Sequence, residues 1–236
     1  MPDGVRIAVR KVACGFLDLL FPDDCRVCGE ALHEVSRIPV CGRCLRQPTV
    51  LVSDTSSPEG VKGLDAVYSF GAYEGPLRKL IHLFKYEGVR PLAKPFGEFL
   101  ALVLPREQQF DVVVPLPLHW RRLFHRRFNQ AGLLAREIAR RWNVPLRNAM
   151  RRTKFTPPQA GLTSAQRRLN MQGAFAPRRK GSLKGLRVLL VDDVLTTGAT
   201  AGACARALKR AGAAHVTLLT LARRDRRLAR EVEVMI

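Results

Sequence analysis

The chain of 236 residues has no apolar run that approaches the roughly 20 residues a membrane-spanning helix needs. We therefore expect no stable insertion in a membrane. Nothing near its start is similar to a secretion signal, so the sequence predicts a cytoplasmic protein. The segment from Val5 to Leu20 has apolar residues at helical spacing and is predicted to be an amphipathic helix that packs on the rest of the protein. Transient contact of this helix with a membrane is the alternative.

Acidic residues are scarce. Asp and Glu number 20 against 40 Lys and Arg, which gives a formal net charge of +20. So large an excess indicates a polyanionic partner or substrate. Several basic clusters contain aromatic residues, among them Trp120, Phe124 and Phe128, and this mixture is typical of proteins that bind single-stranded nucleic acid. The alternative is an arginine-rich composition whose side chains are only solvated, and charge alone does not decide between the two.

Cysteine is uncommon too, with six residues in all, but four of them form two C-x-x-C pairs with twelve residues between the pairs. These four are Cys25, Cys28, Cys41 and Cys44. A glycine follows or interrupts each pair, as the tight turns of zinc knuckles require, and four thiolates suit a closed, structural Zn²⁺ site. Disulfide bonds are the alternative, which the absence of a secretion signal disfavours. The remaining two, Cys14 and Cys204, lie in apolar helical patterns and are predicted to be small buried residues.

The segment from Val188 to Thr200 reads V-L-L-V-D-D-V-L-T-T-G-A-T. Its apolar start predicts a short strand, Val188 to Val191, buried on both faces, so Asp192 and Asp193 are expected where the strand leaves the core. In open parallel sheets, ligands bind at this edge. The next residues offer hydroxyl groups, a flexible glycine and a helix start, which together make an anion-binding loop: Leu195, Thr196, Thr197, Gly198, Ala199 and Thr200. Two carboxylates beside such a loop suit a sugar phosphate, because they accept hydrogen bonds from vicinal hydroxyls or hold Mg²⁺.

This segment resembles the phosphoribosyl-pyrophosphate (PRPP) motif of type I phosphoribosyltransferases. The resemblance implies that Asp192 and Asp193 contact the ribose hydroxyls, directly or through metal and water. It also implies that Leu195 to Thr200 bind the 5′-phosphate. An ordinary strand and turn of another α/β protein is the alternative, but the pattern D-D-x-x-T-T-G-x-T at a strand end is uncommon and favours the resemblance.

Strands and helices alternate along the rest of the chain. Strands are predicted at 66–73, 111–114 and 215–221, and helices at 76–86, 91–104, 130–142 and 199–211. Asn129 stands where it can cap the helix at 130–142. The alternation predicts an α/β fold with a doubly wound, mostly parallel sheet. Residues 45–63 are rich in Pro, Ser and Gly and read as a connection, so we expect the helix and zinc ribbon in 1–58 and a phosphoribosyltransferase-like domain in 59–236.

Further segments narrow the resemblance. They are F-K-Y-E-G from residue 84, D-V-V-V-P-L-P-L-H-W-R-R from 111, F-N-Q-A-G-L from 128 and R-R-T-K-F-T-P-P-Q-A-G-L from 151. With the cysteine pairs, they resemble the ComF family of bacterial phosphoribosyltransferase-like proteins over most of the chain. The resemblance implies that Pro117, Arg121 and Arg122 lie in a loop facing the pyrophosphate, and that residues 151–170 include a flap over PRPP. Basic residues suit both places, because Mg²⁺-pyrophosphate is a dense anion.

The sequence departs from the family pattern at residue 127. The family usually has glycine before F-N-Q, and this chain has Arg127. Glycine there would permit a positive φ or the close approach of another backbone, and arginine suits neither. The detailed geometry from Phe128 to Gln130 therefore need not match that of the family, although the fold is expected to be the same.

ComF proteins are associated with natural transformation, the uptake of single-stranded DNA into the bacterial cytoplasm. As an enzyme, the protein would displace pyrophosphate from C1 of PRPP, with Asp192 and Asp193 holding the ribose as catalytic residues and Mg²⁺ assisting departure. As a non-catalytic adaptor, it would keep the fold to bind PRPP or single-stranded DNA and pass the DNA to other DNA-uptake proteins. We favour a PRPP-binding protein that acts in DNA uptake. The sequence indicates no general base and leaves catalysis open.

Overall fold

The computed structural model describes residues 23–32, 36–48, 61–119, 123–124, 127–154, 171, 173–179 and 181–224. The chain divides into two compact units, Met1–Pro48 and Thr49–Ile236. The boundary that the sequence predicts at residue 58 falls in 49–60, outside the described residues, and stays a prediction. So does the amphipathic helix at 5–20. Within the described part of the chain, no helix combines the length and the apolar character needed to cross a bilayer.

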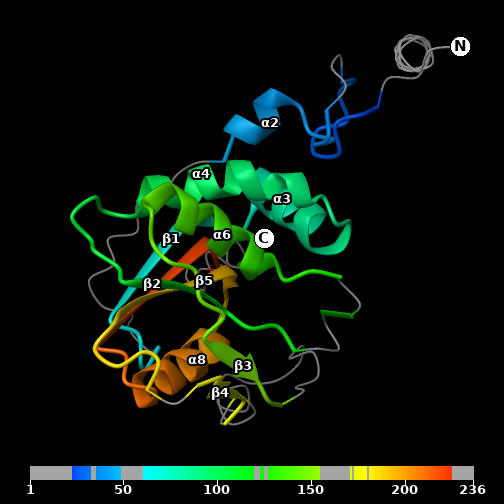
Figure 1. The fold of residues 1–236 in the computed structure, drawn as a ribbon. Coiled ribbons are helices and arrows are strands. Elements are labelled where there is room, and N and C mark those ends of the chain that lie inside the picture. Colours follow the sequence, from blue (N-terminus) through cyan, green and yellow to red (C-terminus); the bar gives the residue numbers. More distant parts are fainter. Residues whose placement is uncertain are drawn as a thin grey trace, which may run out of the picture. The chain divides into compact units, whose positions relative to one another are not determined.

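A four-stranded parallel sheet forms the centre of the larger unit (Figure 1). Its strands are β1 (Ala66–Ala72), β2 (Val112–Pro115), β5 (Arg187–Leu195) and β6 (His215–Arg223), in the order β1-β6-β5-β2. All neighbouring strands pair in parallel. The two central strands are mostly buried, as expected where helices cover both faces of a parallel sheet. A second, antiparallel sheet consists of β3 (Met150–Arg152) and β4 (Phe175–Pro177).

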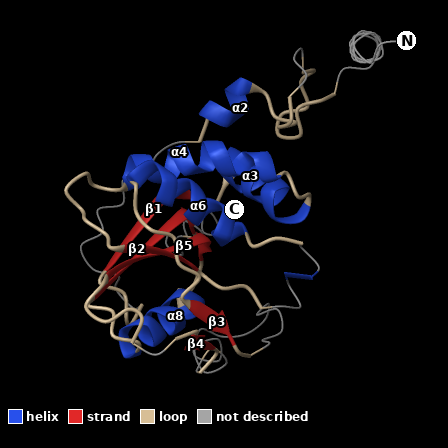
Figure 2. Ribbon diagram, viewed as in Figure 1, coloured by secondary structure: helices blue, strands red, loops and turns tan. Residues whose placement is uncertain are grey.

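Helices cover both faces of the parallel sheet (Figure 2). On one face lie α3 (Gly75–Tyr86), α4 (Ala93–Val103) and α6 (Gln130–Trp142), with a short 3-10 turn, Arg90–Leu92, between the first two. On the other face lies α8 (Ala199–Arg210), next to β4. The prediction of a doubly wound α/β fold with a parallel sheet is therefore confirmed. The smaller unit contains α2 (Gly42–Arg46).

Small side chains let α8 approach the sheet closely. Alanine residues make up much of its buried side, and they belong to one core cluster with Val188 and Leu190 of β5 and with Val216 and Leu218 of β6. Cys204 is in the same cluster and has no exposed surface, which confirms the prediction of a small buried residue. Aromatic rings fill the opposite face, where Phe84 packs edge-on against Phe96 with ring centroids 5.3 Å apart.

One strand is longer than the sequence predicts. The apolar run predicted a strand from Val188 to Val191, whereas β5 continues to Leu195. The extension has a physical cause, because β6 is also long and pairs with β5 as far as Leu195 and Arg223. Asp192 and Asp193 therefore lie inside β5, near its carboxyl end, and not in the loop beyond it.

Arg127 adopts the backbone conformation that the family's glycine would favour. Its φ is 60°, in the left-handed region, and its amide donates to the carbonyl oxygen of Leu123 over 2.7 Å. Holding a residue with a Cβ there costs about 1–2 kcal/mol. The turn it makes brings Phe128 into the core, where its ring centroid lies 6.0 Å from that of Phe84 and 4.9 Å from the guanidinium carbon of Arg90. The strained turn is thus offset by the packing of the residue that follows.

Candidate functional site

The acidic pair lies on β5, and its two side chains face opposite sides of the sheet. Side chains alternate along a strand, and Val188 and Leu190 belong to the core on the α8 side. Asp192 continues that series toward α8, whereas Asp193 pairs with Lys85 of α3 and so faces the side that α3 covers. The Oδ1 of Asp192 accepts a hydrogen bond from the backbone amide of Asp193 over 2.8 Å. The pair is thus joined through the backbone while the carboxylates point apart.

Asp193 forms an ion pair with Lys85, the penultimate residue of α3. The Nζ of Lys85 lies 2.7 Å from the Oδ1 of Asp193, and the two side chains are only 13% and 14% exposed. Burial opposes the charge on Lys85, but attraction to Asp193 outweighs it and raises the pKa of Lys85 above its ordinary value. A positive charge from a distant part of the chain is therefore fixed at the acidic pair.

Asp192 has a different environment. Part of its surface is accessible, although protein atoms surround its carboxylate closely. Burial, followed by repulsion from Asp193, raises the pKa of Asp192 to about 7, against the opposing attraction of Lys85 and Arg152. Arg152, on β3, is half-buried, and its guanidinium carbon lies 5.6 Å from the ring centroid of Phe175. Asp192 is thus a carboxylate largely shielded from solvent, with a pKa close to neutral pH.

The loop after β5 leads directly into α8. Thr196, Thr197 and Gly198 connect the two elements, and Gly198 has a φ of 71°, in the left-handed region. A Cβ at Gly198 would lie 2.4 Å from the Cγ2 of Val61, so both the backbone angle and the neighbouring side chain require glycine. The amide of Ala199 donates to the Oγ1 of Thr197 over 3.4 Å. This arrangement points the first turn of a twelve-residue helix toward the end of β5.

Three of the segments that carried the family resemblance meet beside the acidic pair. Leu116, after β2, donates its amide to the carbonyl oxygen of Val191 over 2.9 Å, which brings Pro117 to the same edge of the sheet. Asn129 occupies the position before α6, but its side chain does not cap the helix. Its Nδ2 donates instead to the carbonyl oxygen of Leu116 over 3.2 Å. The buried Gln130 donates its Nε2 to the carbonyl oxygen of Lys85 over 3.3 Å.

The structure thus brings together most of the predicted sugar-phosphate residues. Asp192, Asp193 and Leu195 to Thr200 are continuous along the end of β5 and the start of α8, and Pro117 lies at the same edge. Arg121 and Arg122 lie outside the described residues, as does 155–170 of the predicted flap. The sequence reasoning did not single out Lys85 as a site residue, although F-K-Y-E-G, which contains it, was one of the segments that carried the resemblance.

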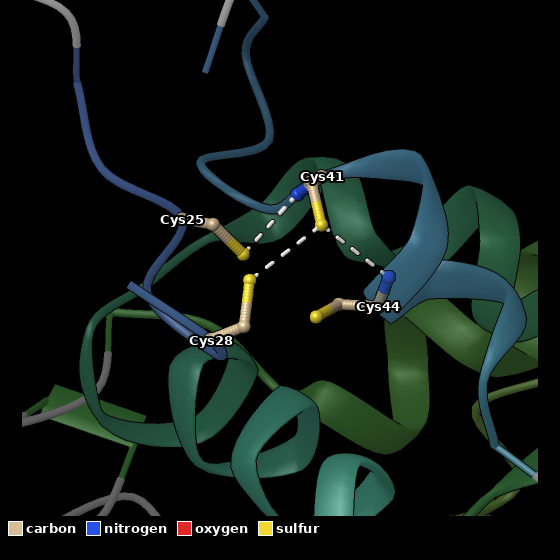
Figure 3. A group of neighbouring side chains, drawn as sticks. All are labelled: Cys25, Cys28, Cys41 and Cys44. Carbon is tan, nitrogen blue, oxygen red and sulfur yellow. Dashed lines mark hydrogen bonds between the residues drawn. The ribbon is translucent and has the colours of Figure 1, made fainter. Parts of the chain in front are cut away.

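The smaller unit brings its four cysteine sulfurs together (Figure 3). All four Sγ atoms lie within 4.8 Å of one another, and those of Cys28 and Cys41 are 3.8 Å apart. Tetrahedral Zn²⁺ with Zn–S bonds of about 2.3 Å places its sulfurs about 3.8 Å apart, so the donor set and the spacing both fit. Every cysteine in the described part of the chain is a free thiol, and the disulfide alternative finds no support there.

Backbone amides orient these sulfurs. The amide of Cys41 donates to the Sγ of Cys25 over 3.3 Å, and the amide of Cys44 donates to the Sγ of Cys41 over 3.4 Å (Figure 3). Gly29, with a φ of 77°, closes the first turn and donates its amide to the carbonyl oxygen of Cys25. Burial raises the pKa of the Cys25 thiol, but the amide hydrogen bonds outweigh this and lower it to about 6. The amides therefore favour the thiolate that a metal needs.

Residues 129–235 match the phosphoribosyl transferase domain. Over 207 residues the chain is 31% identical to "Competence protein F" of Haemophilus influenzae, covering 84% of each protein. It is 32% identical over 215 residues to "DNA utilization protein YhgH" of Escherichia coli K12, covering 84% of this chain and 83% of that one. It is 29% identical over 206 residues to "Competence protein ComFC" of Bacillus subtilis, covering 84% and 77%.

Among solved structures, the chain is similar to the glutamine PRPP amidotransferase of B. subtilis, with 22% identity and a TM-score of 0.39, over 55% of this chain and 26% of the other.

Replacing Gly198 by alanine is expected to destabilise the protein through two separate effects. The left-handed backbone costs a residue with a Cβ about 1–2 kcal/mol, and the crowding against Val61 adds about 1–3 kcal/mol. Gly181→Ala is the matched control, because Gly181 has a φ of 69° and nothing within 4 Å of a Cβ, so it carries only the first effect. Urea unfolding of both variants measures the difference. Equal losses of stability would show that Val61 does not crowd the loop.

Proposed function

Because the chain belongs to the ComF/YhgH family and carries a phosphoribosyltransferase domain, we propose that it binds PRPP or a related sugar phosphate and acts in single-stranded DNA uptake. One observation carries the proposal: the acidic pair, the loop Leu195 to Thr200 and the start of α8 follow one another at the carboxyl end of β5. In parallel sheets, this edge is where ligands bind.

The sugar is proposed to lie against the acidic pair. Carboxylate oxygens accept hydrogen bonds from vicinal hydroxyls, and Asp192 has part of its surface accessible at the end of β5. The 5′-phosphate is proposed to bind the loop, where threonine hydroxyls and the first amides of α8 can donate to its oxygens.

The pyrophosphate of PRPP is proposed to face the loop after β2. Pro117 lies there, and Arg121 and Arg122 follow it in the sequence. Mg²⁺ is proposed to accompany the pyrophosphate, whose negative charge it would neutralise. Both a transferase and a non-catalytic adaptor would bind PRPP, and this binding is what we propose.

The four-cysteine cluster is proposed to hold a structural zinc ion. The cluster offers four sulfurs and no open position for a substrate, as structural sites do. The smaller unit also has few other buried apolar residues in its described part, so a metal is a natural source of its stability. Free thiols in the described chain agree with a reducing compartment, and we propose the cytoplasm.

Single-stranded DNA is proposed as a second partner, together with other DNA-uptake proteins. The formal net charge of +20 supports a polyanionic ligand, and the relatives bear names that refer to competence and to DNA utilization. A DNA-binding adaptor that retains the fold is therefore the second candidate function. The observation that favours it is the charge, which exceeds what one sugar phosphate needs.

Titration calorimetry with PRPP, with and without Mg²⁺, tests the sugar-phosphate site. We expect Asp192→Asn to weaken binding at least about tenfold, because a hydrogen bond to a charged group contributes about 1.5–3 kcal/mol. Asp111→Asn is the control, since Asp111 precedes β2 at the opposite edge of the same sheet and pairs there with Arg187 at 2.8 Å. It should bind PRPP as the wild type does. Negligible binding by the wild type, or equal binding by all three proteins, would refute the site.

Metal analysis of the purified protein tests the cysteine cluster. About one zinc per chain is expected, and Cys25→Ser should lose it, because a structural site with three sulfurs binds the ion far more weakly. Cys204→Ala should keep the zinc, since Cys204 lies in the core of the larger unit. A wild-type protein that is folded and free of zinc would contradict the assignment.

Binding of single-stranded DNA should fall steeply with salt. The logarithm of the binding constant falls linearly with the logarithm of the salt concentration. For a single strand, each phosphate that a lysine or arginine neutralises steepens this fall by about 0.7. Fluorescence anisotropy with a labelled oligonucleotide between low and physiological salt measures this slope. A slope near zero, or no binding at low salt, would contradict the proposed binding of single-stranded DNA.

A further inference from the structure

The ion pair between Lys85 and Asp193 distinguishes this acidic pair from one built to hold a metal. The ammonium of Lys85 is 2.7 Å from the Oδ1 of Asp193, and both side chains are largely withdrawn from solvent. The lysine is also fixed from behind, because Gln130 donates to its backbone carbonyl and its neighbour Phe84 lies in the aromatic core. Its cationic group is part of the folded site.

The geometry of the two carboxylates also argues against a metal site at the acidic pair. Asp192 faces the α8 side of the sheet, whereas Asp193 faces the α3 side. One oxygen of Asp192 already accepts the amide of Asp193, and one oxygen of Asp193 already accepts Lys85. Mg²⁺ demands near-octahedral oxygen ligands at about 2.0–2.1 Å. One oxygen of each carboxylate is thus already engaged, and a fixed ammonium lies beside Asp193.

We propose that Lys85 is the permanent counter-ion of Asp193 and keeps divalent cations off the acidic pair, so that Asp192 contacts the sugar hydroxyls directly. Mg²⁺ then reaches the site only as the partner of pyrophosphate. The ammonium of Lys85 offsets the charge of one carboxylate, and Arg152 also attracts Asp192, so the pair can accept hydrogen bonds from neutral hydroxyls but is poorly suited to a bare dication near the lysine. The part about hydroxyls rests on the proposed function, whereas the exclusion of cations does not.

Manganese alone, measured by electron paramagnetic resonance on the zinc-loaded protein, tests the exclusion. In the wild type we expect no Mn²⁺ site at Asp193, so Asp193→Asn should leave Mn²⁺ binding unchanged. Lys85→Met should gain one such site, and the double variant Lys85→Met/Asp193→Asn should lose it again. Lys79→Met is the control, because it removes the same charge from the exposed side of α3 and should bind as the wild type does. If Lys85→Met does not fold, Lys85→Gln takes its place, since it keeps a neutral donor beside Asp193.

Two results would overturn the proposal. One is a Mn²⁺ site in the wild type that Asp193→Asn removes. The other is the absence of a gained site in every folded variant that lacks the Lys85 charge, which would mean that the lysine is not what excludes the metal.

Ribose 5-phosphate then tests the direct contact, because it has the hydroxyls and the 5′-phosphate but no pyrophosphate to carry Mg²⁺. Its affinity for the wild type should be the same in EDTA and in Mg²⁺, within about twofold, and Asp192→Asn should weaken it. An affinity that rises tenfold with Mg²⁺ would overturn the direct contact. If neither ribose 5-phosphate nor PRPP binds the wild type while the Mn²⁺ results are as expected, the proposed function fails and the exclusion of cations stands.

Discussion

The position of β5 decides where every other part of the candidate site can lie. It pairs in parallel with β6 on one side and β2 on the other, and both of its faces are covered by helices. A strand held in this way cannot slip by one residue without moving its apolar side chains to the wrong face. Asp192 and Asp193 are therefore fixed in depth and in direction. The loop, the start of α8 and the segment after β2 all take their places from the end of this one strand.

Local patterns in the sequence predict much of this arrangement. The helix at 130–142 has the predicted bounds, and the cysteine spacing predicts a cluster that the structure forms. Both depend on neighbours in the chain, where periodicity and turn residues are informative. The length of β5 was predicted less well, because its last four residues are held by hydrogen bonds to β6, and those depend on a strand that begins twenty residues later. Propensity does not contain that information.

The ion pair at Asp193 shows a second limit of prediction from the sequence. Lys85 and Asp193 are joined only when α3 packs on the sheet, and nothing in the spacing of either segment places the ammonium at the carboxylate. The F-K-Y-E-G segment was identified by resemblance, and its chemical part at the site becomes visible only in three dimensions. The same is true of Asn129, which stands where a helix cap was predicted but donates its side-chain amide to Leu116 in the loop after β2. In both cases a polar side chain links two elements that are separate in the sequence.

The left-handed backbone at Arg127 has a bearing on how members of this group are identified. The turn before F-N-Q has a left-handed backbone even though arginine stands there, and the aromatic ring after it is buried. A search pattern that demands glycine at this point would discard the chain even though its fold is intact. Arginine reaches a left-handed dihedral angle at this position, so the residue type alone does not identify the turn.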